Sequence, residues 1–589
     1  MKPIALGFLV LVFTITACGD TAKEPKKVRE ARGGVTYGGV FRINEVEGFR
    51  SLFPLNITEA TAHRIANQVF EGLVKFNQKT LMVEPSLAER WELNQDANSI
   101  TFHLRKGVLF HDDACFAEGK GREVTARDFQ YCFEQLCTYH ANNQVFFLFK
   151  DRVKGANEYF ASTKTGQPLE EGVSGVKVID DYTLQLDLIT PFGGFLNILG
   201  QPGCWVFPKE AVEKYGDEVR TKTIGTGPFV MKTVKENEAV ILARNANYWR
   251  KDEFGNALPY LDRVRFTFEK EKKIELLNFR KGNLDMVFTL PLEMLDEIAG
   301  ELEDARSGKH PDYDIQTTTA MGSQYYGFQH QLEPFKDVRV RQAFNYAINR
   351  DEIVEYALQG DAEPAIYGIV PPVFQKYQSS RLKGYTYSPE RAQELLSDAG
   401  FPNGEGFPKL TMELNRGGQN NVLIAEVVQK MLQENLGIEV ELNEMSMAQY
   451  LDNTESGRSL FWREAWIADY PDPETFLNLL LGEHVPLDGD EKAYVNSVRY
   501  QNAEYDSVFK EAMMASDQED RFRLYRLADQ IALDDAAILP IYYEEFTRLL
   551  APNVRNFPQN AMEYRDLSEV YFKASAEEQA AKKQVSELR

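Results

Sequence analysis

Strand-like and helix-like segments alternate along nearly the whole chain. An extended stretch, "GGVFRINE", is followed by "ATAHRIANQVFEGLV", in which Ile65, Val69 and Leu73 recur at helical spacing. The alternation returns after residue 320, where "DVRVRQAFNYAINRDEIVEYAL" places apolar residues on one helical face. At 589 residues the chain is longer than one hydrophobic core usually serves. These patterns predict an α/β protein with two or more domains.

The net charge of the chain limits the classes of ligand and partner that it is expected to bind. Its formal net charge is −23, and its 43% hydrophobic and 12% aromatic content is that of a globular protein. Phosphate contacts require clustered Lys and Arg, so this charge argues against nucleic acids and anionic membrane surfaces. A ligand with a cationic end is easier to attract, although solubility is the simpler interpretation of the charge.

The amino terminus predicts export and lipid attachment. The apolar run "IALGFLVLVFTI" is too short to span a membrane but suits a signal peptide, which we place at residues 1–17. It ends in "ITAC", which resembles a bacterial lipobox in which Cys18 becomes the lipidated first residue. The alternative is an exported protein with a chance cysteine. The polar residues 18–35 predict a tether, so we expect an extracytoplasmic protein anchored by lipid to a bacterial membrane.

The remaining cysteines are Cys115, Cys132, Cys137 and Cys204, which are candidates for disulfide bridges in an oxidising compartment. Sequence does not choose among the three full pairings. Five positions separate Cys132 from Cys137 in a helical-looking stretch, which favours Cys115 with one of them over their mutual pairing. No CxxC spacing or His pair suggests zinc. We therefore predict structural bridges or buried thiols and no metal site.

Catalytic motifs are missing from the sequence. It contains no HExxH, GxSxG, GxxxxGK[ST] or GxGxxG, and its seven His are scattered without ligand-like spacing. We therefore expect a protein that is not an enzyme and needs no cofactor.

One stretch, "REAWIADYPDPETF", concentrates four acids: Glu464, Asp469, Asp472 and Glu474. A glycosidase would use two carboxylates from separate segments facing each other across a substrate, and four acids in one Pro-rich loop do not show that. We expect Asp472 and Glu474 to face water or to cap the helix that follows.

A binding role fits the same stretch better. One carboxylate beside Trp466 and Tyr470 could receive an ammonium group, because an ionised acid in an apolar wall is stable only when paired. Asp469 suits that role. Arg463 could receive a carboxylate through its two-pronged guanidinium.

Several stretches together resemble the extracytoplasmic solute-binding proteins of peptide ABC transporters, the oligopeptide/dipeptide/nickel-binding family. The resemblance runs from Gly38 to Phe572. The stretches that carry it stand in the family's order: "EPSLAERWELNQDANSITFHLRKGVLFHDD", "VTARDFQYCFEQL", "GTGPF", "NYWR", "PFKDVRVRQAFNYAINRDEIV" and "WIADYPDPETFL".

The resemblance implies a periplasmic-binding-protein-like fold of type II, in which two α/β lobes close like a venus flytrap and an extra subdomain is inserted in the first. Two strands would cross between the lobes, near residues 318–321 and 539–543. The implied parts are lobe I at 36–79, 173–319 and 541–575, the inserted subdomain at 80–172, lobe II at 320–540 and a polar tail at 576–589.

It also implies a function and a site. The protein would be a monomer that binds peptides without catalysis and delivers them to the permease subunits of an ABC transporter. Asp469 would hold the peptide's α-ammonium and Arg463 a carboxylate, while Tyr325 and Tyr326 would line the cleft or pack in the core. The family's S-L-D-P is "SLFP" here, with Phe53 in place of the Asp. Relatives of this shape bind nickel complexes, oligosaccharides or haem, so another solute remains the alternative.

Overall fold

The computed structural model describes residues 29–573 except 141–142, 291–303, 305–306, 308–312, 361, 417–418, 488–490 and 516. The first lobe is built on a four-stranded sheet in which β3 pairs in parallel with β12 and the other neighbours are antiparallel. Its strands, in spatial order, are β10 (Phe229–Lys235), β11 (Ala239–Arg244), β12 (Arg263–Thr267) and β3 (Val40–Asn44). Helices α1 (Ala60–Ala66), α4 (Phe195–Ile198), α5 (Lys209–Tyr215) and α6 (Lys272–Arg280) belong to the same half of the chain.

A second four-stranded sheet forms the inserted subdomain. Its order is β6 (Ala88–Leu93), β7 (Ser99–Leu104), β9 (Thr183–Asp187) and β8 (Val176–Asp180), and helices α2 (Ala126–Leu136) and α3 (Ala156–Lys164) lie between β7 and β8 in sequence. The sheet extends past residue 172, where the sequence suggested a boundary. Strands β8 and β9 come after the helices in sequence; β9 hydrogen-bonds back to β7, and β8 pairs with β9 at the edge of the sheet.

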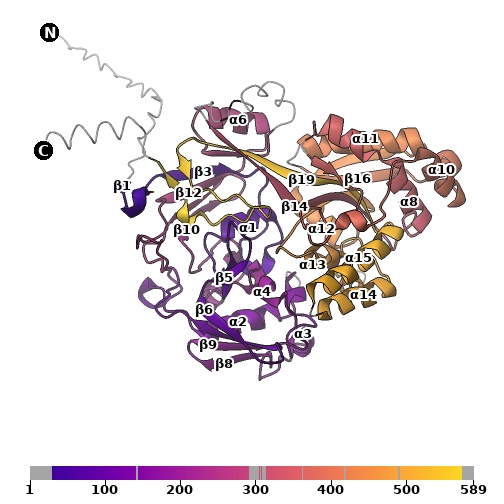
Figure 1. Cartoon of the computed structure of the whole chain (residues 1–589). Coiled ribbons are helices and arrows are strands. Elements are labelled where there is room, and N and C mark those ends of the chain that lie inside the picture. The colour runs from indigo at the N-terminus through magenta and orange to yellow at the C-terminus, as the bar shows by residue number, and fades with distance from the viewer. Residues whose placement is uncertain are drawn as a thin grey trace, which may run out of the picture.

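Two long antiparallel strands connect the lobes (Figure 1). They are β14 (Asp314–Phe328) and β19 (Ile538–Leu550), and they contain the two positions at which crossovers were expected. Their sheet runs β13 (Met286–Phe288), β19, β14, β18 (Phe461–Ile467), β16 (Leu410–Asn415) and β17 (Val440–Met445). It thus joins the first lobe, through β13, to the second.

Helices surround the second lobe's part of this sheet. On α8 (Val338–Ala347) the predicted apolar face is confirmed, because Val340, Ala343, Phe344 and Ala347 are all buried. The other α-helices are α9 (Arg350–Glu352), α10 (Pro389–Asp398), α11 (Gln419–Leu436), α12 (Met447–Glu455), α13 (Glu474–Leu477), α14 (Ala503–Met514) and α15 (Gln518–Asp534).

The four cysteines of the described chain are free thiols, so the disulfide prediction is wrong and the buried-thiol alternative holds for three of them. Cys132, Cys137 and Cys204 are buried, and Cys115 is half-buried. The Cys132 Sγ accepts a hydrogen bond from the backbone N–H of Phe207 at 3.3 Å. Burial raises the pKa of these buried thiols, which keeps them protonated and unreactive.

Several sequence predictions fall outside the described residues. They concern the signal peptide at 1–17, the lipidated Cys18 with residues 18–28 of the tether, and the tail at 576–589. Among the described helices, none is both long and apolar enough to cross a bilayer.

Candidate ligand-binding cavity

A cavity of about 300 Å³ lies where the two lobes and the inserted subdomain meet. The first lobe contributes residues between Ile57 and Arg64, the inserted subdomain contributes Val145 and Phe147, and the second lobe contributes the whole run from Arg463 to Asp469. Clefts between domains are common ligand sites because each domain supplies one wall and their relative motion opens the way in.

Asp469 lines this cavity just beyond the end of β18. The Thr475 hydroxyl donates to its Oδ2 at 3.3 Å, and Gln201 of the first lobe donates to its backbone carbonyl at 2.5 Å. No basic side chain of the described residues lies within ion-pair distance of the carboxyl. Burial therefore raises the pKa of Asp469 from 3.8 to about 7, with a smaller increase from the charge of Glu474. A cation from outside the chain would stabilise the ionised form.

Trp466 also lines the cavity, as the sequence suggested. Its indole N–H donates to the Thr475 hydroxyl at 3.3 Å, and its ring lies 5.9 Å from that of Tyr494. Tyr494 is a second aromatic wall that sequence analysis missed. No motif marks Tyr494, and it reaches the cavity only because its segment folds back beside β18.

Tyr470 does not form the wall predicted for it. Its side chain is buried, and its hydroxyl donates to the carboxylate of Glu474. The expectation that Glu474 faces water is also wrong. Glu474 is fully buried and pairs with Arg152 of the inserted subdomain at 2.9 Å. The side chains of Tyr470 and Glu474 thus fix the loop to the inserted subdomain and do not face the cavity.

Asp472 caps the next helix as predicted but is not exposed. Its Oδ1 accepts the backbone N–H of Glu474 at 3.1 Å, at the start of α13. Its other oxygen pairs with Arg521 of α15 at 2.5 Å, and its side chain is buried. The predicted helix cap is therefore also an ion pair between two helical segments.

Arg463 lines the cavity with its guanidinium bound only to amide oxygens. It donates to Asn415 Oδ1 at 3.1 Å and to the amide oxygen of Gln324. Burial acts to lower the pKa of Arg463, but neighbouring phenols and acids outweigh burial and raise it. Among the described residues no carboxylate forms an ion pair with Arg463, so this cation remains available for one from a ligand.

Tyr325 and Tyr326 lie on opposite faces of β14, because successive side chains of a strand alternate. Tyr325 lines the cavity, opposite Glu464 in the register. Tyr326 stacks on Phe461 in the second lobe's core, with ring centroids 5.3 Å apart. The core alternative therefore holds for Tyr326 and the cleft alternative for Tyr325.

Two further acids face the cavity, and neither was assigned a role from sequence. Glu47 of the first lobe accepts a hydrogen bond from the Asn415 amide, and Glu464 accepts from the Trp462 indole N–H at 3.3 Å. Burial raises the pKa of each from 4.5 to about 7. No motif marks Glu47, and Glu464 sits in the expected motif beside the more conspicuous Arg463.

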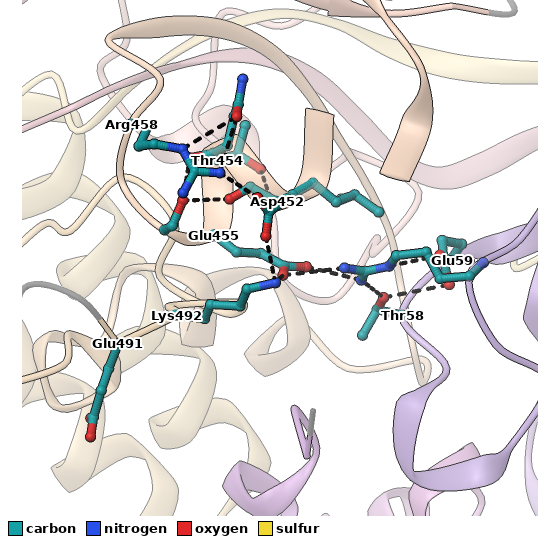
Figure 2. A network of polar contacts seen from close by, with 12 residues as sticks. Thr58, Glu59, Asp452, Thr454, Glu455, Arg458, Glu491 and Lys492 are labelled. Atoms are coloured by element: carbon teal, nitrogen blue, oxygen red, sulfur yellow. Dashed lines mark hydrogen bonds and ion pairs between the residues drawn. The ribbon is translucent and has the colours of Figure 1, made fainter. Parts of the chain in front are cut away.

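A network of charged side chains joins the two lobes (Figure 2). Arg50 of the first lobe pairs with Glu59 at 3.0 Å and reaches across to Glu455 of α12 at 2.9 Å. Lys492 adds a contact to Glu455 at 3.5 Å and one to Asp452 at 2.9 Å. Glu59 and Glu455 both line the cavity, so the network is part of its wall.

Among the described residues, no group of three metal-ligating side chains is found.

Comparison with known proteins places this geometry in a family. Residues 82–485 match the model of bacterial extracellular solute-binding proteins, family 5 Middle. The chain is 26% identical to heme-binding protein A of Haemophilus influenzae, over 95% of this chain and 97% of that protein. It is 28% identical to the periplasmic oligopeptide-binding protein OppA of Salmonella typhimurium, over 86% of this chain and 88% of that protein.

Two solved structures are similar over nearly their whole length. The murein tripeptide binding protein MppA of Escherichia coli matches with a TM-score of 0.78 and 25% identity, covering 90% of this chain and 98% of that one. OppA of Haemophilus influenzae, solved in complex with the peptide RPPGFSPFR, has the same TM-score and identity, covering 91% and 99%. These matches establish the two-lobed, type II periplasmic-binding-protein-like fold expected from sequence.

Proposed function

Because the chain belongs to the bacterial extracellular solute-binding proteins, family 5, we propose that it binds peptides in the cavity between its lobes and delivers them to an ABC transporter. The observation that carries this proposal is Asp469, an acid that lines the cavity without a basic partner among the described residues. A peptide supplies the missing cation through its amino terminus.

The remaining cavity groups suit the rest of a peptide. Arg463 receives a carboxylate, because its guanidinium contacts only amide oxygens of Asn415 and Gln324. Trp466 and Tyr494 provide apolar surface for side chains. Peptide main chain binds by strand-like hydrogen bonds, and water fills the space around variable side chains. OppA of Salmonella typhimurium is an oligopeptide-binding protein, and OppA of Haemophilus influenzae was solved with a bound peptide, which supports the same ligand class here.

The proposal is tested by replacing Asp469 with Asn, which keeps the shape and removes the charge. Breaking a buried ion pair on one side costs about 3–5 kcal/mol, so we expect peptide affinity to fall by a factor of about 100 or more. Isothermal titration calorimetry with free and N-acetylated peptides measures the loss. Acetylation should weaken binding to the wild type and have little further effect on Asp469→Asn. Equal affinities of the two proteins for the free peptide would refute the assignment.

We propose further that the protein is a monomer held outside the cytoplasm by a lipid on Cys18, with residues 1–17 removed as a signal peptide. The support is the apolar run followed by "ITAC" and a polar tether. Cell fractionation tests the anchor: the wild type should follow the membranes and Cys18→Ser should not. A wild type found free of membranes would contradict it.

A further inference from the structure

The acids of the cavity outnumber the bases that could neutralise them. Glu47, Glu464 and Asp469 line it, and among the described residues none of the three forms an ion pair. Arg463 is the one lining base of the described chain that likewise has no carboxylate partner. Of the other lining bases, Arg64 pairs with Glu45 behind the wall at 2.8 Å, and burial lowers the pKa of His63 to about 4, which keeps its ring neutral near pH 7.

The other lining acids are already neutralised. Glu59 and Glu455 share Arg50, and Lys492 adds a second contact to Glu455. Glu563 pairs with Arg565 at 2.6 Å and also with Arg548. The excess of negative charge is therefore confined to the three acids without a partner, and one ligand ammonium at Asp469 leaves two of them unmatched.

Resting on the proposed function, we infer that the peptides bound here carry a basic side chain in addition to their amino terminus, and that Glu464 receives this second positive charge. The substrate class is thus peptides containing Lys or Arg. Glu464 becomes the residue that determines specificity, while Asp469 serves every peptide through its amino terminus.

One ammonium does not serve both acids. From Glu464 to the end of β18 at Ile467 the strand extends for about 10 Å, and Asp469 follows beyond that end. An ion pair requires the nitrogen and oxygen to approach within about 4 Å. Consistently, the charge that shifts the pKa of Asp469 within the described chain is that of Glu474, and not that of Glu464. The two carboxyls act as separate sites.

The surroundings of Glu464 suit a long cationic side chain. Its oxygens accept from the Trp462 indole N–H at 3.3 Å and from the backbone N–H of Ala465 at 3.2 Å. Both donors are neutral, so neither cancels the negative charge of the ionised carboxylate, which retains further acceptor capacity. Met447 and Leu451 of α12 line the same cavity and offer apolar surface. The methylene stem of a Lys or Arg packs on such surface while its charged end meets the carboxylate.

Neighbouring charges leave this site acidic. Arg463 is the base that acts on Glu464, but its guanidinium donates to Asn415 and Gln324. The negative charge of Glu455 also acts on Glu464, and the half-buried Glu544 beside Arg463 offsets part of the positive charge of Arg463. The net charge of −23 on the whole chain favours the approach of a cationic ligand.

The inference is tested with alanine-based peptides of three to five residues. Each carries either Lys or norleucine, an uncharged analogue of its stem, at one position in turn. Isothermal titration calorimetry on the purified wild type should find at least one position where Lys binds about 10-fold or more tightly than norleucine, the gain of one charge-assisted contact. In Glu464→Gln this preference should disappear, while the affinity for the norleucine peptides is kept.

The matched control is Glu413→Gln. Glu413 accepts hydrogen bonds from Ser459 and Asn453 next to the cavity but does not line it, so this variant also removes one negative charge and should keep the Lys preference. Thermal unfolding without ligand verifies that both variants fold.

The possible results distinguish a failure of this inference from a failure of the proposed function. If peptides bind the wild type but Lys and norleucine are equivalent at every position, or if Glu464→Gln keeps the preference, the inference is overturned and the proposed function stands. If no peptide of either kind binds the folded wild type, the proposed function falls and takes the inference with it.

Discussion

At the scale of single residues, two aspartates differ in whether a basic side chain lies beside the carboxylate. Asp566 pairs with Lys75 and Arg250, each at 3.0 Å, and these charges hold its pKa well below 3.8 although burial opposes them. Asp469 is held by the neutral donor Thr475, and burial raises its pKa to about 7. The same chemical group is therefore paired with cations inside the chain in one place and lines a cavity without a basic partner among the described residues in the other.

The raised pKa of Glu464 predicts how stability changes with pH. In the unfolded chain this carboxyl ionises near 4.5, and in the folded protein only near 7. Between these values the folded state holds the extra proton, so the ligand-free protein loses stability as pH rises from 4.5 to 7. In Glu464→Gln the side chain at this position cannot ionise, so its contribution to that loss of stability should be absent. Urea unfolding should therefore give the variant a higher free energy of unfolding than the wild type at pH 8. At pH 4 the two free energies should differ little.

The comparison needs a control for the other buried acids, because Asp469 and Glu47 titrate in the same window. They are present in both proteins, so their contribution cancels in the difference between wild type and variant. A difference in unfolding free energy that is the same at both pH values would show that Glu464 ionises normally.

At the scale of elements, strand β18 separates two environments. Phe461 packs in the second lobe's own core, while Trp462 belongs to the large core that also contains the first lobe. Beyond Trp462 the register with β16 ends, whereas pairing with β14 continues to Ile467. The unpaired edge of β18 is where Arg463 and its successors meet the cavity. One strand thus contributes both to the core and to the wall of the cavity.

At the scale of the whole molecule, ion pairs join parts that must separate for a ligand to enter. Arg50 and Glu455 connect the two lobes at the wall of the cavity. Arg152 and Glu474 connect the inserted subdomain to the second lobe, and both are buried. Strands β14 and β19 are the continuous link between the lobes, so these contacts favour closure around that link.

Replacing Arg50 with Met should shift the protein toward an open form. The substitution keeps the stem, and among the described residues it leaves Glu59 and Glu455 with only Lys492 to offset their repulsion. Closure then costs more, and we expect peptide affinity to fall about 10-fold, the equivalent of one charge-assisted contact. Small-angle X-ray scattering of the ligand-free protein should show a larger radius of gyration.

The control for this experiment is Lys209→Met. Lys209 pairs with Glu213 within α5, where both side chains are more than half exposed, so its loss should change neither affinity nor shape. An Arg50→Met protein with wild-type scattering and affinity would show that the lobes close without this ion pair.

Much of the architecture follows from the sequence alone, because the period of apolar residues and the length of the chain are properties of neighbouring residues. They predict the α/β class, the apolar face of α8 and, with the resemblance to a family, two lobes crossed by strands at positions that lie in β14 and β19. The same local motif led to Asp469, Trp466 and Arg463, all of which line the cavity.

Tertiary structure decided which of the remaining residues face the cavity. Tyr470 stands in the motif but is buried against Glu474, whose ion-pair partner Arg152 lies 322 positions earlier. Glu47 enters the cavity from the opposite end of the chain, beside Asn415. Burial and ion pairing depend on groups brought together from distant segments, and local sequence does not encode that distance. The sequence by itself determined the fold and the first acid of the site, and only the folded chain decided how many acids remain without a cation.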